Sequence, residues 1–167
     1  ITQTQTRENE AQLRHLLESA PDPIIAINAA GEIIIANKMI EKVFGYSKAE
    51  LLGHPIEMLI PERFHDTHLN YRAEYLQAPE SRPMRDYDGE VVRARAKDGR
   101  EFPVEVNLGP LETASGLIIT GSVRDISDRK AIEHALEEER QQLISVMETS
   151  PVAVGVVTNG LFSYVNQ

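Results

Sequence analysis

A stretch of alternating apolar and charged residues near the middle of the chain constrains the fold most. In "EVVRARAKDGREFPVEVNLGPL" (90–111), apolar residues take every second position on both sides of the Asp98-Gly99 pair. A period of two is typical of a β-strand with one buried face, and Asp-Gly is a preferred hairpin turn. The segment therefore predicts a β-hairpin with these buried side chains: Val92, Ala94, Ala96, Phe102, Val104, Val106 and Leu108.

Two further segments supply the rest of a sheet. "IIAINAAGEIIIAN" (24–37) has two short β-rich runs around Gly31, which predicts a second hairpin, and "GLIITGSVRDIS" (116–127) predicts a fifth strand. Short helical segments lie between them, and residues 78–89 read as a loop by composition. The order predicts an α+β domain with a five-stranded antiparallel sheet.

One predicted helix carries a histidine on an aromatic face. In "IPERFHDTHLNYRAEYLQ" (60–77), steps of 4, 3 and 4 place Phe64, His68, Tyr71 and Tyr75 on one side. His68 either binds a ligand or is a hydrogen-bonded core residue. His65 points elsewhere, and the two histidines alone are a weak signal for a metal site.

Helices are predicted on both sides of this domain. Residues 2–19 predict a helix whose second half, with Leu13, Leu16 and Leu17, docks on the core. Residues from 127 predict a long helix with a narrow heptad-like seam, broken at Glu139. A polar helix with so narrow an apolar seam is rarely stable alone, so we expect it to pair with a second helix. Its apolar residues are Ile132, Leu136, Leu143 and Val146.

The end of the chain repeats its beginning. "METSPVAVGVVTNGLFSYVN" (147–166) aligns with "LESAPDPIIAINAAGEIIIAN" (17–37), with a one-residue gap. The aligned pairs are Glu18 with Glu148, Pro21 with Pro151, Gly31 with Gly160 and Asn37 with Asn166. We therefore expect four parts, with a truncated second copy at the end. They are an N-terminal flanking helix (1–19), a domain (20–126), a linker helix (127–149) and the start of a second domain (150–167).

Composition excludes several classes of function. The chain of 167 residues has a net charge of -9, which argues against a nucleic-acid binder and against an anionic membrane surface as partner. It has no cysteine, which removes disulfides, thiolate nucleophiles and cysteine-linked chromophores. No signal peptide or membrane-spanning apolar run is visible, so we expect a cytoplasmic protein. No nucleophile–base set or phosphate loop indicates an enzyme.

The chain resembles the PAS sensor domains of bacterial signalling proteins. Four segments carry the resemblance: "LLESAPDPIIAINAAGEIIIAN", "FGYSKAELLGHPIEMLIP", "RAKDGREFPVEVNLGPL" and "GSVRDIS". The resemblance implies a five-stranded sheet with helices on one face enclosing a pocket. It also implies signal transfer through flanking helices that pair in a homodimer. Arg124 and Asp125, which end the last strand, are implied as the relay to the exit helix; an ordinary helix cap is the alternative.

Within that family, the oxygen-sensing haem domains place a proximal histidine on this helix. Here "IPERFHDTHLNY" fits, with His68 at the ligand position and Tyr71 after it. Candidate pocket walls are Ile56, Leu59, Phe64, Val91, Val104, Val106 and Ile119. The sequence departs from that subgroup in the segment expected to supply a distal ligand, where Met84 falls in a predicted loop.

Three functions remain open on the sequence alone. The first is a sensor and dimerisation module that binds a small ligand or cofactor and relays the change to an output domain. That output would be a histidine kinase of a two-component system or a cyclic-dinucleotide enzyme such as a diguanylate cyclase. The second is a haem-based gas or redox sensor with His68 as proximal ligand. The third, ranked last, is an enzyme. A non-covalent flavin also stays possible as the cofactor of the first.

Overall fold

The computed structural model describes residues 3–86, 89–152 and 155–165. Its contacts divide the chain into two compact units, Ile1–Ser127 and Asp128–Gln167. Each unit is described by itself. No helix in the described ranges combines the length and the apolar composition that a membrane crossing requires.

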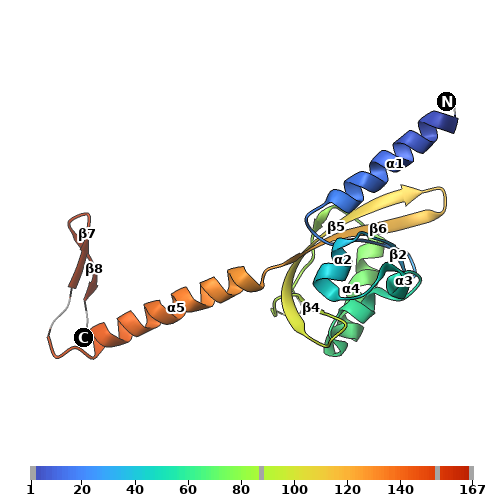
Figure 1. Ribbon diagram of the computed structural model, residues 1–167. Helices are drawn as coiled ribbons and strands as arrows, with labels where there is room; N and C mark the ends of the chain where they lie inside the picture. The colour runs from blue at the N-terminus through green and yellow to red at the C-terminus, as the bar shows by residue number, and fades with distance from the viewer. Residues whose placement is uncertain (1–2, 87–88, 153–154, 166–167) are drawn as a thin grey trace. The chain divides into compact units, whose positions relative to one another are not determined.

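The first unit is built on an antiparallel sheet with short helices gathered on one side of it (Figure 1). Its strands are β1 (Ile24–Asn28), β2 (Ile33–Ala36), β3 (Arg82–Pro83), β4 (Arg93–Arg95), β5 (Glu101–Thr113) and β6 (Gly116–Asp125). The spatial order is β2-β1-β6-β5-β3, and β4 also pairs with β5. The predicted α+β sheet is confirmed.

The structure adds a sixth, very short strand. Strand β3 lies in the segment 78–89, which the sequence predicts as a loop, and pairs with Leu108 and Asn107 of β5. It has only two residues, one of them a proline, so its sequence carries no strand periodicity.

The hairpin predicted from alternation is present. Ala94 faces Phe102 across β4 and β5, and both are buried, as are Val92, Ala96 and Val104. Gly99 takes a φ of 88° at the turn, a conformation that favours glycine. The period of two therefore located both the strands and their buried face.

The helices follow the local signals closely. They are α2 (Met39–Phe44), α3 (Lys48–Leu51), the 3-10 helices η1 (Ile56–Leu59) and η2 (Glu62–Phe64), and α4 (His65–Gln77). Ser47 accepts from the amide of Glu50, whose carboxylate accepts from the Ser47 amide, so α3 begins with a capping box. Phe64 at the end of η2 and His68 and Tyr75 of α4 are buried, and Tyr71 is half-buried against the core, so the predicted face is turned inward.

Helix α1 (Gln3–Ser19) is attached differently from the prediction. Leu13 and Leu16 are 62% and 65% exposed, so the expectation that the leucines dock on the core is wrong for them. The attachment is polar: the Leu17 carbonyl accepts from the Asn37 side chain at 3.0 Å, and Glu18 pairs with Lys48. A helical apolar spacing predicts which residues share a face but not what covers that face.

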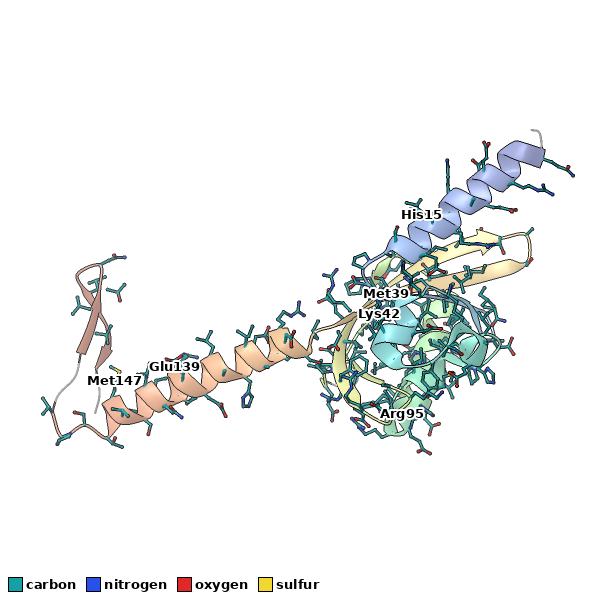
Figure 2. All side chains as sticks on the ribbon, viewed as in Figure 1. His15, Met39, Lys42, Arg95, Glu139 and Met147 are labelled. Carbon is teal, nitrogen blue, oxygen red and sulfur yellow. The ribbon has the colours of Figure 1, made fainter. Side chains whose placement is uncertain are left out.

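The second unit consists of a helix and a hairpin. Helix α5 (Ser127–Glu148) is long and carries its apolar seam exposed, interrupted at Glu139 (Figure 2). Strands β7 (Gly155–Thr158) and β8 (Leu161–Val165) pair with each other around Asn159 and Gly160, which take φ of 53° and 80°. Asn166, the partner of Asn37 in the predicted repeat, lies outside the described residues.

Candidate functional site

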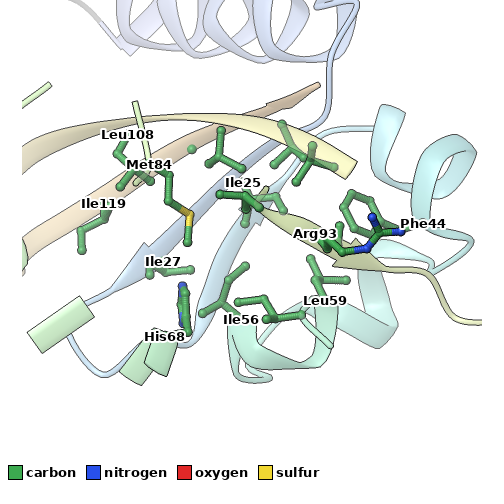
Figure 3. Close-up of a pocket in the computed structure, with 17 residues that line it drawn as sticks. Ile25, Ile27, Phe44, Ile56, Leu59, His68, Met84, Arg93, Leu108 and Ile119 are labelled. Atoms are coloured by element: carbon green, nitrogen blue, oxygen red, sulfur yellow. The ribbon is translucent and has the colours of Figure 1, made fainter. Parts of the chain in front are cut away.

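A cavity of about 100 Å³ lies between the inner face of the sheet and the helices of the first unit (Figure 3). Its wall is almost entirely apolar. The strands contribute Ile25, Ile27, Val104, Val106, Leu108, Ile119, Gly121 and Val123, the helices α2 and η1 contribute Phe44, Ile56 and Leu59, and Ile60 follows η1. His68 and Arg93 are the polar side chains in this wall, and Arg93 lies 3.9 Å from the Glu101 carboxylate. Such a lining suits an apolar ligand body with few directional contacts.

A second cavity of about 70 Å³ adjoins the first. The two share five lining residues, Ile27, His68, Met84, Leu108 and Ile119, which lie where the two cavities meet. The smaller cavity differs in its chemistry, because it also has these polar residues: Tyr71, Arg72, Glu74, Tyr75, Arg82 and Arg85.

Most residues predicted as pocket walls do line these cavities. Ile56, Leu59, Val104, Val106 and Ile119 line the larger one, and Tyr71 lines the smaller one. His68 lines both.

Two predicted wall residues lie elsewhere. Phe64 is buried but lines neither cavity, and Val91 is replaced by its neighbour Val92. The error at Val91 is one of register, because adjacent residues of an extended chain face opposite sides.

The sequence places Met84 in a loop, away from the site. In the structure, Met84 lines both cavities. It follows β3 directly, and its amide donates to the Val106 carbonyl at 2.8 Å. In Figure 3 the Met84 and His68 side chains reach the larger cavity from opposite sides. The short strand β3, which carries no sequence signal, is what places this thioether.

His68 is held by a buried carboxylate. Its Nδ1 lies 2.9 Å from Oε1 of Glu57, and only about a tenth of each side chain is exposed. Arg72, one turn further along α4, reaches the same oxygen at 3.5 Å. Burial alone would raise the pKa of the Glu57 carboxyl. The His68 hydrogen bond, with the charges of His68 and Arg72, outweighs burial and lowers that pKa.

Arg72 links this cluster to the turn of the first hairpin. Gly31 has a φ of 86°, and a Cβ at this position would lie 1.1 Å from Nη1 of Arg72. Any side chain at position 31 would therefore displace the guanidinium. Nη1 of Arg72 is buried and has no hydrogen-bond partner in the described structure. The sequence analysis did not identify Glu57 and Arg72. In the sequence alone, a charged residue that is buried on a helix cannot be distinguished from one exposed to solvent.

The described residues contain no cluster of three metal-binding side chains. The His65 side chain is hydrogen-bonded to the backbone, with its Nε2 2.8 Å from the Ile60 carbonyl oxygen.

The exit from the sheet joins three parts of the first unit. Asp125 accepts from the amide of Ser127 at 2.9 Å, where α5 begins. Arg124 binds Asp22, between α1 and β1, at 2.8 Å through Nη2 and 3.2 Å through Nε. Hydrogen bonding and charge from Asp22 raise the pKa of Arg124. Both predicted relay residues thus contact segments at the ends of the domain.

A comparison with protein families matches residues 11–126 to the model for the PAS fold. The match covers the sheet, helices α2 to α4, both cavities and the part of α1 from residue 11 onward. Among solved structures, the PAS domain of an HTR-like protein from Haloarcula marismortui has a TM-score of 0.62 and 24% identity. That comparison covers 74% of this chain and 96% of the other, and shows the same fold.

Two curated relatives are sensor proteins. Sensor protein FixL from Bradyrhizobium diazoefficiens is 29% identical over 161 residues, which is 96% of this chain. Oxygen sensor protein DosP from Escherichia coli is 26% identical over 124 residues, or 74% of this chain. The matched regions are only 31% of FixL and 15% of DosP, so this chain corresponds to a minor part of each.

Proposed function

The chain belongs to the PAS family, and we propose that its first unit is a sensor that converts occupancy of the apolar cavity into a change at the start of α5. The observation that carries this proposal is the path of β6. Ile119, Gly121 and Val123 of this strand line the cavity, and Arg124 and Asp125 follow immediately. A ligand that displaces the cavity wall therefore acts on the strand that leads into the helix.

The relay needs two conformations of the junction between β6 and α5, and the ligand must bind the protein with different affinity in each. The contacts of Arg124 with Asp22 and of Asp125 with Ser127 are exposed polar contacts, which are weak enough to exchange. The exposed seam of α5 offers a surface for a second copy of the chain, and a homodimer would transmit the change to an output domain. An output of the kinase or cyclic-dinucleotide class is in keeping with relatives named as sensor proteins.

The second unit supports a tandem arrangement. In the first hairpin, Ile25, Ala26 and Ile27 pair with Ala36, Ile35 and Ile33, with a register shift after Ala26. In β7–β8 the pairs are Gly155 with Val165, Val156 with Tyr164 and Val157 with Phe162, with the shift after Val156. The two hairpins have the same register and the same irregularity under the sequence alignment with its one-residue gap. We propose that residues 150–167 begin a second PAS domain.

A test of the sensor proposal fills the cavity artificially. Val106→Phe adds a ring to the cavity wall and should mimic an occupied state. Hydrogen exchange of the amides around Ser127 should then change relative to the unmodified chain, and Arg124→Gln should abolish that change. Arg95→Gln, a matched charge removal in β4, should leave it. A change confined to the cavity strands, with none at Ser127, would contradict the relay.

A haem-based gas or redox sensor is the second candidate. Two observations favour it: the His68 imidazole and the Met84 thioether both reach the cavity, and one relative is named an oxygen sensor. Imidazole and thioether are both axial ligands of haem iron, so the donor set fits. His68 would hold the group, and a bound haem would supply an iron centre for gas binding or electron transfer.

The volume of the cavities, unlike the donor set, does not match haem. Pockets for drug-sized ligands span about 300–1,000 Å³, whereas the two cavities measure about 100 and 70 Å³. Haem would have to separate α4 from the segment that carries Met84. An absorption spectrum of the protein as isolated, and after adding haem, tests this beside His68→Ala. A Soret band that is lost in His68→Ala supports haem binding through His68. A Soret band that is unchanged in His68→Ala contradicts it, and a flavin absorption spectrum would identify flavin as the cofactor.

A further inference from the structure

The smaller cavity carries positive charge that the overall composition does not suggest. Arg72, Arg82 and Arg85 line it, against one carboxylate, Glu74. The chain as a whole has a net charge of -9. A cavity wall with an excess of one sign concentrates the field inside it and attracts the opposite charge.

These arginines are incompletely satisfied by the protein. Arg72 approaches Glu57 at 3.5 Å, and its Nη1 is buried without a hydrogen-bond partner. Arg82 donates through Nη1 to the Pro83 carbonyl at 3.1 Å and lies 3.7 Å from Glu80, which is largely exposed. Both distances to a carboxylate exceed the 2.7–2.9 Å of a strong charge-assisted hydrogen bond. In the described part of the chain no ion pair involves Arg85. Donors remain available on all three side chains.

The arginines run from the surface inward. Arg85 is exposed, whereas the side chain of Arg72 is only 14% exposed. Beyond them, past residues that line both cavities, such as Met84 and Ile119, lies the larger cavity with its mostly apolar lining. The two cavities together thus have a cationic end and an apolar end.

We propose that the ligand of this sensor is a small amphipathic carboxylate, with its apolar chain in the larger cavity and its carboxylate against the arginines of the smaller one. This inference rests on the sensor function proposed above and names its ligand class. The planar guanidinium group matches a carboxylate in bidentate geometry, which a neutral or cationic head group does not offer. The small cavity volumes favour a short aliphatic chain over a drug-sized molecule.

Hexanoate, 1-hexanol and hexylammonium are matched probes, because they share the chain and differ in the charge of the head group. Binding is followed by ¹⁵N-HSQC titration of the whole chain. We expect hexanoate to bind at least about tenfold more tightly than either other probe, the effect of one charge-assisted hydrogen bond. Shifts should cluster at Ile119, Gly121 and Met84.

Three variants locate the charge effect. Arg85→Gln changes an exposed residue, so folding is unaffected, and it should weaken hexanoate about tenfold while leaving hexanol unchanged. Arg82→Gln should act in the same way, with thermal unfolding of the free protein as the check on its packing against Tyr75. Arg95→Gln removes the same charge outside both cavities and should change neither probe.

The outcomes separate this inference from the sensor proposal. The carboxylate inference is overturned if hexanoate and hexanol bind equally, or if Arg82→Gln and Arg85→Gln leave hexanoate affinity unchanged. Either result is still compatible with an apolar sensor cavity. Absence of binding by all three probes overturns the inference as well. If Val106→Phe also leaves the amides at Ser127 unchanged, the sensor proposal fails independently.

Discussion

The hairpins β1–β2 and β7–β8 share a pairing register and a bulge but differ in burial. In the first, Ile25 and Ile27 are buried and Ile33 has no exposed surface. In the second, Val156, Val157 and Leu161 are 41%, 56% and 74% exposed. Strand β1 also pairs with β6, whereas β7 and β8 pair only with each other in the described part of the chain. Local sequence thus forms the hairpin, and burial depends on the strands and helices around it.

Hydrogen exchange should show the largest difference between the two hairpins. Amides of β1 lie inside the sheet and should open only with global unfolding, which costs about 5–15 kcal/mol. An isolated two-stranded hairpin is marginally stable at best. We expect protection at Ile25 and Ile27 to exceed that at Val156 and Val157 by at least about a thousandfold. Equal protection would mean that β7–β8 is stabilised by partners of its own.

Removing the Asn37 side chain should have the next largest effect. Asn37 is 1% exposed; its Oδ1 accepts from Ile24, and its Nδ2 donates to the carbonyls of Leu17 and Asp22. Asn37→Ala leaves these backbone groups without partners and should destabilise the first unit by about 3 kcal/mol in urea unfolding. Asn28→Ala, at the exposed end of β1, should cost under about 1 kcal/mol. Similar losses for the two would contradict the anchoring role of Asn37.

Equivalent apolar positions should respond unequally to truncation. Ile27→Ala removes a buried residue next to both cavities and should cost about 2–3 kcal/mol, at the low end because space already adjoins it. Val157→Ala, at the matching register position of β7, should stay within about 0.5 kcal/mol of the unmodified chain. Thermal and urea unfolding measure both. A cost above 1 kcal/mol at Val157 would show that β7 contributes to a core.

The pH dependence should separate two carboxylates, and this is the smallest effect. The pKa of Glu57 is lowered in the folded state, so its stabilisation is present above the ordinary value of 4.5 and is lost as the pH falls through the folded pKa. At pH 7, Glu57→Gln should cost about 1–2 kcal/mol, and the cost should shrink below pH 4.5. The pKa of Glu137 is lowered by exposed contacts with Gln141 and Arg140, so Glu137→Gln should leave the pH profile unchanged. A pH-independent cost at Glu57 would mean that its charge is unimportant.

Several features of the fold could be read from short stretches of sequence. Alternation located the β4–β5 hairpin and its buried face, and the Ser47–Glu50 spacing located a capping box. The repeat alignment placed two strands near the end of the chain, where β7 and β8 pair. These predictions succeed because each depends on residues within one turn, one strand or one hairpin.

The misses have a common cause. Leu13 and Leu16 were expected in the core, Val91 was expected at the cavity in place of Val92, and Met84 was expected outside the site. Each depends on which distant surface a side chain meets. Strand β3 illustrates this, because its two residues have no strand periodicity and form a strand by pairing with β5.

Local sequence patterns were enough to predict strands β1, β2, β4, β5 and β6, the buried face of the β4–β5 hairpin and the position of His68 on α4, because backbone propensity and side-chain period are local. Packing of distant segments brings Glu57 to both His68 and Arg72, places Met84 opposite His68 across a cavity and gathers three arginines around the smaller cavity. These contacts join residues from α4, η1 and the segment around β3. Their energies depend on burial and distance, which exist only once the chain has packed.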